Sequence, residues 1–489
     1  MHPLNTSITD ALEAASQADT ALFCTPGHKR GQSIPPSIQR LMGAQAYRID
    51  LPDLPGFNLF EPDGVIAAAQ AQAAKTFGAD QSWFLVNGST VGVMASILAT
   101  CGPGDKIILP RNVHTSAISG LILSGAHPVF IYPEYDPQWD LAHCITPQSV
   151  AQALTQYPET KAVLMVSPTY HGVVGDVGAI AQLAHQHGIP LIVDEAHGAH
   201  FGFHPDLPPS ALSLGADLVV QSTHKTLSAL TQASMLHQRS ASVNAARVRS
   251  ALQMLQTSSP SNLLLASLEG ACHQMLTNGH ELLTQTLALA HEARANIAAV
   301  AGLQVLQLPQ YPTSGFYDLD RTRLTVDVSA LGLDGFTADE ICTAQFGIIA
   351  ELPTLRHLTF LLSLGNTPQD LERLFYALAH LSQHSPSTQS FAYLTAGLKT
   401  EPTQPDSPAL SPRDAYFAPR ITMPIAQAAG HISAETLCPY PPGIPITLPG
   451  EVITRAAIAS LQQTQAAGGL ITGCADSTLQ QLQVVAKKL

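Results

Sequence analysis

The sequence lacks the features of a membrane, exported or nucleic-acid-binding protein. No stretch approaches the roughly 18 uninterrupted apolar residues of a membrane-spanning helix, and the opening MHPLNTSITD lacks the basic start and apolar centre of a signal peptide. Basic residues are few, 23 Lys and Arg against 36 Asp and Glu, and the formal net charge of −13 argues against a broad basic binding surface. We therefore expect a soluble, cytoplasmic protein with no membrane and no nucleic-acid partner.

Paired cysteines and a high density of charge are also missing. The seven cysteines include no C-x-x-C pair, so neither a disulfide framework nor a thiolate zinc site is indicated. Charged residues make up only 12% of the chain and hydrophobic residues 45%, which is typical of a packed α/β protein. A chain of 489 residues is long enough for several domains.

Short apolar runs between residues 80 and 225 alternate with longer helix-like stretches, which predicts a buried parallel sheet. The runs cover residues 82–87, 106–110, 127–132, 161–167, 190–195 and 217–222. Ligands of open parallel sheets bind beyond the carboxyl ends of the strands. Those ends carry the polar residues 87–90, 167–169, Asp194 and 222–225, so we expect the functional site there.

The rest of the chain predicts further units. Residues 245–300 read as long helices, and 323–329 and 357–365 as strands of a smaller α/β layer. The C-terminal unit is expected to contain a short helix from Pro424 to Gly430 and to finish with two helix-like stretches. The predicted division is an N-terminal segment (1–30), a large domain (31–300), a small domain (301–385), a Pro/Ser-rich linker (386–412) and a C-terminal domain (413–489).

Lys225 is the residue around which we expect the chemistry. It follows a buried strand and is flanked by Ser222 and His224, so its amine could form a Schiff base beside an anion-binding cluster, although a lone Lys is usually a solvated surface charge. Asp194 ends an earlier apolar strand and could keep the pyridine nitrogen of pyridoxal 5′-phosphate (PLP) protonated, although such an Asp also commonly caps a helix. The two residues together predict a PLP site.

A phosphate site is predicted where the first of these strands gives way to a helix. Gly88, Ser89 and Thr90 offer backbone N–H groups and hydroxyls at a helix start, a favourable place for an anion, although a plain Ser/Thr helix cap would look the same. Ser222 and His224 could add donors from the other side. His114 follows another strand at similar depth and could stack on the pyridine ring, although a lone His is more often structural.

Two other interpretations fit less well. The string DEAH at 194–197 matches a helicase box, but the chain has no G-x-x-x-x-G-K-[ST] loop to hold a nucleotide. Asp194, His197 and His200 could be imagined as metal ligands, yet their spacing is not that of zinc hydrolases and Lys225 would stay unexplained. We predict no metal.

Taken together, the motifs resemble the Orn/Lys/Arg decarboxylases in their short bacterial form. The resemblance covers most of the chain, in TPGHKRG (25–31), EPDGVI (61–66), VNGSTVGVMA (86–95), RNVHTS (111–116), SPTYHGVVGD (167–176), DEAHGAHF (194–201), STHKTLSALTQ (222–232), TSSPSNLLLASLEG (257–270), GIIAELP (347–353) and PYPPGIPITLPGE (439–451). It implies the PLP-dependent transferase fold type I: an α/β large domain with a mainly parallel sheet, a smaller α/β domain and a C-terminal α+β domain. The receiver-like N-terminal domain of the longer enzymes is expected to be missing.

The resemblance also implies roles for single residues. Lys225 would be the Schiff-base lysine, Asp194 the partner of the pyridine nitrogen, His114 the stacking ring and Ala196 the small residue on the opposite face. His197 would lie near the phenolic oxygen of the cofactor or the substrate carboxylate.

Further roles concern the phosphate and the substrate. Ser89, Thr90, Ser222 and His224 would hold the cofactor phosphate. Ser258 or Ser259 would reach the phosphate of a neighbouring subunit, because the active sites of the family form between two chains of a homodimer or higher homo-oligomer. Glu351 would lie near the distal cation of the substrate, where a buried carboxylate favours a positive group, unless it is a plain surface Glu.

The implied reaction is decarboxylation of a basic L-amino acid, arginine or lysine ahead of ornithine, to the amine and CO2, feeding polyamine metabolism. Fold and cofactor alone do not select the bond that breaks, so an aminotransferase or lyase of the same fold stays an alternative, separable by its products. A catalytically silent regulatory homologue is another alternative. The presence of Lys225, Asp194 and the phosphate donors argues against it.

Overall fold

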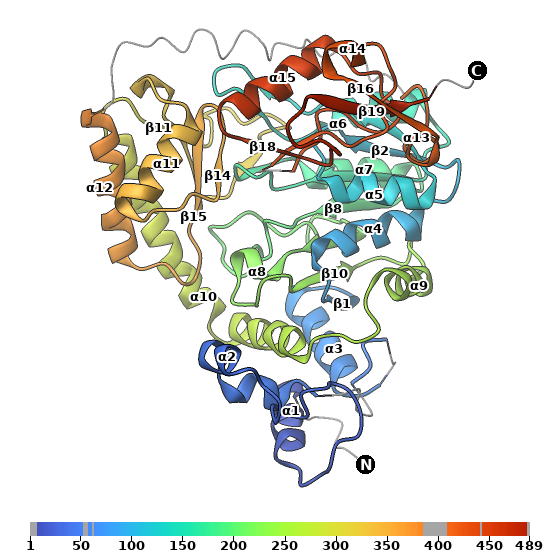
Figure 1. The fold of residues 1–489 in the computed structure, drawn as a ribbon, viewed down its shortest axis with the longest axis vertical. Coiled ribbons are helices and arrows are strands. Elements are labelled where there is room, and N and C mark those ends of the chain that lie inside the picture. The colour runs from blue at the N-terminus through green and yellow to red at the C-terminus, as the bar shows by residue number, and fades with distance from the viewer. Residues whose placement is uncertain (1–6, 52–56, 61–62, 385–407, 441–442, 487–489) are drawn as a thin grey trace.

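The computed structural model describes residues 7–51, 57–60, 63–384, 408–440 and 443–486. Most of the predicted linker 386–412 and parts of the segments EPDGVI and PYPPGIPITLPGE lie outside the described residues. Figure 1 shows the central sheet and its helices in the middle of the molecule. A smaller sheet with α11 and α12 lies at one side, and the C-terminal elements lie above the central sheet in this view. The N-terminal helices α1 (Ile8–Gln17) and α2 (Pro36–Ile49) lie at the opposite end from the C-terminal elements.

The central sheet has seven strands in the order β1-β10-β9-β8-β6-β2-β3. The strands are β1 (Gln81–Leu85), β2 (Lys106–Pro110), β3 (His127–Ile131), β6 (Ala162–Val166), β8 (Leu191–Asp194), β9 (Leu218–Gln221) and β10 (Ser234–Gln238). The six predicted strands are confirmed, and five of them pair in parallel. The sequence did not predict β10, which runs antiparallel to both of its neighbours, β1 and β9.

Helices cover both faces of this sheet because its strands are apolar on both sides. Along β2, Ile108 belongs to the hydrophobic cluster that α3 (Val65–Phe77), α6 (Pro147–Gln156) and α7 (Val177–Gln186) cover. Its neighbour Ile107 belongs to the cluster on the other face. The helices of that second face are α4 (Gly88–Thr100), α5 (Thr115–Ser124) and α9 (Ala245–Leu255).

A second sheet is antiparallel and smaller, in the order β11-β13-β15-β14. Its strands are β11 (Gln304–Val305), β13 (Arg323–Asp327), β14 (Leu352–Pro353) and β15 (His357–Leu361), packed with α11 (Gly335–Phe346) and α12 (Pro368–His384). The predicted strands at 323–329 and 357–365 are confirmed. The predicted long helices are α9 and α10 (Asn262–Ala298), and α10 contributes to the cores of both the central and the smaller sheet.

The C-terminal elements form two short antiparallel pairs with three helices. They are α13 (Pro412–Phe417), β16 (Arg420–Pro424), α14 (Ile425–Ala428), β17 (Cys438–Tyr440), α15 (Arg455–Ala466), β18 (Leu470–Thr472) and β19 (Gln481–Val485). The short helix after Pro424 is confirmed. The predicted second terminal helix is wrong, because β19 pairs with β16 and buries Leu482 and Val484, two residues apart, as a strand does.

Arg111, just after β2, connects the central sheet to the C-terminal elements through hydrogen bonds. Its guanidinium donates to the carbonyls of Pro445 (2.7 Å) and Ile446 (3.0 Å) and to the carboxylate of Glu451 (2.9 Å). The remaining elements of the described residues are short: β4 (Tyr135–Asp136) with β5 (Leu141–Ala142), β7 (Val173–Val174) with β12 (Asp318–Leu319), α8 (Thr223–Thr226) and η1 (Ser329–Leu331). Within the described ranges, no helix is both long and apolar enough to cross a membrane.

Candidate active site

The carboxyl ends of the central strands surround one small cavity. It is lined by Ser89, His114, Val166, Pro168, Tyr170, Asp194, Ala196, His197 and Lys225. Six of the predicted site residues are among them, because β6, β8 and β9 are parallel neighbours and α4 and α5 begin at the same edge. Gly88 and Thr90 flank Ser89, His224 precedes Lys225, and Ser222 lies three positions before Lys225, but these four residues do not line the cavity themselves.

The amine of Lys225 and the carboxylate of Asp194 share this cavity. Lys225 lies in the single-turn helix α8, which follows β9, and Asp194 is the last residue of β8. Burial lowers the pKa of Lys225, while the charge of Asp194 acts in the opposite direction. Burial raises the pKa of Asp194, and its Oδ1 accepts a hydrogen bond from the backbone N–H of Ala196 at 3.2 Å. Each group would be stabilised in its charged form by an ionic partner.

His114 is fixed by the helix that it caps. Its Nδ1 accepts a hydrogen bond from the backbone N–H of Ser116 at 3.1 Å, at the start of α5. Nδ1 is therefore unprotonated, and the proton of the neutral ring is on Nε2. Burial lowers the pKa of His114, which favours this neutral ring.

The predicted phosphate site lies at the start of α4. Gly88 begins the helix with a φ of +77°, and the preceding Asn87 makes no side-chain cap, because its Oδ1 accepts from the N–H of Thr257 at 3.1 Å instead. The first N–H groups of α4 are thus left without that cap and suit an anion. The hydroxyl of Ser222 donates to that of Ser89 at 2.8 Å, so two hydroxyls from separate elements meet here.

His224 is held differently from a simple phosphate donor. Its Nδ1 lies 2.9 Å from the carbonyl oxygen of Ala233, so Nδ1 carries a proton. Its Nε2 can donate to a phosphate only when the ring is protonated, and burial lowers the pKa of this ring. A nearby dianion would oppose that effect.

Three further predicted residues, Ser258, Ser259 and Glu351, do not line the cavity either. Ser258 and Ser259 are exposed, and the predicted contact of these serines is with a second chain. Glu351 was predicted to lie near the distal cation of the substrate, with a plain surface Glu as the alternative. Its side chain is 40% exposed at the edge of the smaller sheet, with Oε1 4.0 Å from Nη1 of Arg323. Glu351 still acts electrostatically on Lys225.

The structure adds two residues that the sequence did not single out, Arg323 and Tyr170. Arg323 is the first residue of β13, is completely buried, and directs its Nη2 to the Nδ1 of His197. The ring of Tyr170 lies 4.9 Å from the ring of His197, tilted by 60°. The signal for Arg323 was a charged residue at the head of the apolar strand RLTVDV.

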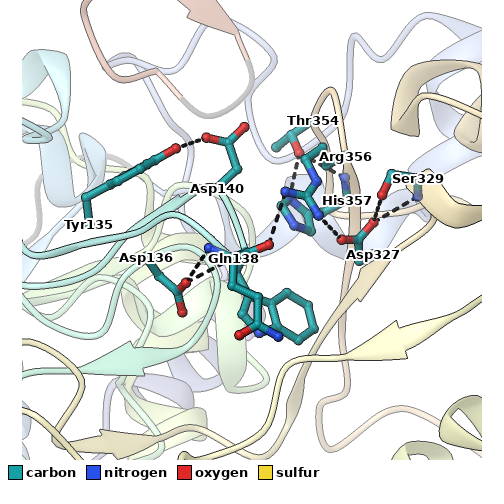
Figure 2. A network of polar contacts seen from close by, with 10 residues as sticks. Tyr135, Asp136, Gln138, Asp140, Asp327, Ser329, Thr354, Arg356 and His357 are labelled. Atoms are coloured by element: carbon teal, nitrogen blue, oxygen red, sulfur yellow. Dashed lines mark hydrogen bonds and ion pairs between the residues drawn. The ribbon is translucent and has the colours of Figure 1, made fainter. Parts of the chain in front are cut away.

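A second cavity adjoins the first, since Val166 and Tyr170 line both. Residues of the β4–β5 hairpin and of the loop before β15 line this second cavity. Figure 2 shows the network of polar contacts between these two segments. Arg356 donates to the carboxylate of Asp327 at 2.5 Å and to the carbonyl of Gln138 at 3.1 Å. Asp140, which accepts from the hydroxyl of Tyr135, also lines this cavity.

The imagined metal ligands do not come together. The Nε2 of His200 lies 3.3 Å from Oδ2 of Asp320, which lies between β12 and β13. His200 does not line the cavity that Asp194 and His197 line. In the described part of the chain, no group of three or more His, Cys, Asp or Glu side chains is placed to hold a metal ion.

A mainly parallel sheet with a lysine and an aspartate at neighbouring strand ends, beside an open helix start, is the arrangement expected of the PLP-dependent enzymes of fold type I. Comparison with known proteins narrows this class. Residues 6–315 match the major domain of the Orn/Lys/Arg decarboxylases, and residues 399–477 match their C-terminal domain. The chain therefore belongs to the Orn/Lys/Arg decarboxylase family.

Individual relatives agree with this assignment. The chain is 39% identical to an arginine decarboxylase of Bacillus subtilis over 483 residues, 98% of each protein. It is 25% identical to the lysine decarboxylase LdcA of Pseudomonas aeruginosa over 541 residues, 88% of this chain and 72% of that protein. The crystal structure of the Francisella novicida lysine decarboxylase LdcF has the same fold, with a TM-score of 0.82 at 20% identity, covering 98% of this chain and 81% of that one. The protein is thus a PLP-dependent decarboxylase of a basic amino acid.

Proposed function

We propose that the substrate is L-arginine and that the products are CO2 and the amine agmatine. The amine would feed polyamine metabolism. The observation that carries this proposal is the 39% identity to an arginine decarboxylase along 98% of both chains. The lysine decarboxylase LdcA matches at only 25% identity and over 72% of its length. Specificity for arginine fits the more similar relative.

Lys225 and Asp194 would serve the cofactor. When bound, PLP supplies the electron-accepting ring that allows a carboxylate to leave the α-carbon of an amino acid. The amine of Lys225 would bond covalently to its aldehyde carbon, and the carboxylate of Asp194 would hold a proton on the pyridine nitrogen. Both groups lie in one cavity, where burial raises the pKa of Asp194 and lowers that of Lys225, so each would gain from an oppositely charged partner.

The other lining residues would hold and shape the cofactor. His114 would lie flat against one face of the ring and Ala196 against the other, and both line the cavity. His197 would keep a proton near the reacting nitrogen. Ser89, Thr90, Ser222 and His224, with the N–H groups at the start of α4, would bind the phosphate.

Glu351 would attract the guanidinium of the substrate. Its carboxylate is partly exposed and lies 4.0 Å from a nitrogen of Arg323, so a substrate cation would share it with that residue. The other candidate is Asp140 in the adjoining cavity, since Val166 and Tyr170 connect the two spaces. Arg356 does not cancel the charge of Asp140, because it is paired with Asp327.

A product assay tests this function directly. The purified protein, loaded with PLP, is given arginine, lysine or ornithine, and both CO2 and the organic product are measured. We expect CO2 and agmatine from arginine, at a kcat/KM at least about tenfold above that for lysine or ornithine, which corresponds to about 1.4 kcal/mol of discrimination. Keto acid or ammonia would indicate the aminotransferase or lyase alternative, and no turnover of any amino acid would indicate a silent homologue.

We also propose that the enzyme works in the cytoplasm as a homodimer or larger homo-oligomer. Ser258 and Ser259 are exposed in the single chain, which leaves them accessible to the phosphate site of a second subunit. Light scattering on the purified protein should give at least twice the mass of 51.7 kDa of one chain. A monomer with full activity would rule out the role of these serines across an interface.

A further inference from the structure

Arg323 reaches the candidate active site from the smaller sheet. Its side chain is completely buried, and its Nη2 lies within hydrogen-bond distance of the Nδ1 of His197. On the other side of the same ring, the Nε2 of His197 lies 2.9 Å from the Nζ of Lys225. A continuous chain of three side chains therefore leads from β13 to the amine that would bond the cofactor.

The direction of each hydrogen bond follows from the chemistry of a guanidinium, which can donate but cannot accept. Nδ1 of His197 must therefore be the acceptor, and the single proton of the neutral ring must be on Nε2. That proton is directed at the Nζ of Lys225, which can accept it only with the lone pair of an uncharged amine. A lysine ammonium would instead place two donors opposite each other.

The surrounding charges keep Arg323 ionised and the imidazole neutral. Burial lowers the pKa of Arg323, but the carboxylates of Asp320 and Glu351 favour its charge, and a guanidinium keeps its proton inside a protein. His197 is buried and faces Lys225, Arg323, His114 and His224, and all of these groups disfavour a second proton on its ring.

Lys225 is subject to opposed influences. The carboxylates of Asp194 and Glu351 favour its ammonium form, whereas burial and the charge of Arg323 favour the amine. The hydrogen bond from His197 adds a contact that only the amine can make.

We propose that Arg323 is a positioning residue for Lys225: by donating to Nδ1 of His197 it keeps the ring proton on Nε2, and so holds Nζ of Lys225 as an uncharged amine, ready to bond to an aldehyde. Only an uncharged amine has the electron pair that forms the C–N bond. In that condensation the aldehyde oxygen leaves as water, taking both protons of the amine, and nothing is oxidised or reduced. This inference rests on the proposed role of Lys225 but not on the identity of the substrate.

The test measures the protonation of Lys225 itself. The full-length protein is freed of cofactor, and recovery of decarboxylase activity on adding PLP shows that its fold is native. The rate of acetylation of each lysine by trace acetic anhydride is then followed from pH 6 to pH 11 by peptide mass spectrometry, with the exposed Lys75 as internal reference. We expect an apparent pKa for Lys225 at least about 1 below that of Lys75.

Variants separate the relay from the direct charge of Arg323. Arg323→Met should raise the apparent pKa of Lys225 by about 1, which lowers its labelling rate at pH 7 about tenfold. Arg323→Lys, which keeps a cation and a donor, should recover at least about half of that change. Arg321→Met is the matched control, because Arg321 is exposed and its guanidinium bonds only the carbonyl of Asp206 among the described residues. This variant should leave the apparent pKa of Lys225 unchanged.

Substitutions at His197 decide between the two explanations. The Gln side chain in His197→Gln offers one acceptor and one donor, so the apparent pKa of Lys225 should stay near that of the wild type. The Leu side chain in His197→Leu offers neither, so the apparent pKa of Lys225 should rise as in Arg323→Met. In the His197→Leu background, Arg323→Met should raise the apparent pKa of Lys225 by less than it does in the wild type, because only the direct charge of Arg323 is then lost. An undiminished effect there would show that Arg323 acts by charge alone and would overturn the proposal.

The same pair of His197 variants covers the case in which Arg323→Met does not fold. Equal labelling of Lys225 in His197→Gln and His197→Leu would then overturn the proposal. A protein that decarboxylates arginine normally but shows no lowered pKa at Lys225 would contradict this inference and leave the proposed function standing. A protein with a lowered pKa at Lys225 but no decarboxylation would contradict the proposed function and leave this inference standing.

Discussion

The hydroxyl of Ser222 donates a hydrogen bond to the hydroxyl of Ser89 at 2.8 Å, although the two serines are 133 positions apart in the chain. Ser222 follows β9 and Ser89 lies in the first turn of α4, so the contact joins two elements at the edge of the central sheet. The uncapped N–H groups of α4 lie at the same place. This pairing of two hydroxyls with a free helix start is the basis of the proposed phosphate site.

Removing either hydroxyl should weaken cofactor binding. We expect Ser222→Ala and Ser89→Ala each to raise the dissociation constant of PLP about tenfold, because a hydrogen bond to a charged group contributes roughly 1.5 kcal/mol or more. Equilibrium dialysis at several PLP concentrations measures this. Ser96→Ala is the control, because Ser96 lies on the same helix but donates to the carbonyl of Gly92 at 2.8 Å. Equal weakening by all three variants would argue against a phosphate at this place.

Replacing Asp194 should affect turnover far more than cofactor attachment. Asp194→Asn keeps the shape and removes the negative charge, so we expect kcat to fall about 10²- to 10³-fold while PLP stays bound to Lys225. Steady-state kinetics and the ratio of PLP to protein together show this. The control is Asp176→Asn, because Asp176 caps α7 through the N–H of Ala179 and an amide caps as well as a carboxylate. A kcat within a few-fold of wild type for Asp194→Asn would exclude its proposed role.

The acid that recognises the substrate can be identified by comparing two variants. Glu351→Gln should raise the KM for arginine about three- to tenfold with little change in kcat, a modest effect because the carboxylate is partly exposed. Asp140→Asn, in the adjoining cavity, should change KM less. If Asp140→Asn has the larger effect on KM, the guanidinium binds in the second cavity and the proposal for Glu351 fails.

The C-terminal elements should depend on Arg111 for their attachment. Arg111→Met leaves Glu451 and the carbonyls of Pro445 and Ile446 without this donor, and we expect the free energy of unfolding to fall by about 2 kcal/mol. Urea unfolding followed by circular dichroism measures the change. Arg420→Met is the comparison, since Arg420 bonds only to C-terminal residues among those described, and it should cost much less.

The strand ends could be predicted from the sequence because parallel strands buried on both faces are continuous apolar runs, as in KIILP and PLIVD. The strand β10, SMLHQ, was missed because its polar residues are buried too. His237 bonds the hydroxyl of Ser82 at 2.6 Å and the side chain of Gln221 at 3.2 Å, in the strands on either side. A buried polar network across three strands has no apolar pattern to indicate it.

The C-terminal strand and Arg323 were missed for other reasons. Gln, Leu and Lys around residues 480–488 favour a helix by composition, but pairing with β16 imposes an extended chain on β19. Arg323 contacts His197, 126 positions away in the chain, and only the packing of the smaller sheet against the central one brings them together. A single sequence shows that a charged residue heads the apolar strand RLTVDV, but it does not show which distant residue that charge contacts.

Reduction with borohydride followed by peptide mass spectrometry tests the central claim most directly, because it fixes PLP to whichever lysine holds it. We predict one pyridoxyl phosphate group per chain, on the peptide that contains Lys225, and none in Lys225→Ala, whose kcat should fall at least about 10³-fold. The control Lys75→Ala, on the exposed side of α3, should be labelled and active as wild type. A label on another lysine, or full activity without Lys225, would contradict the account.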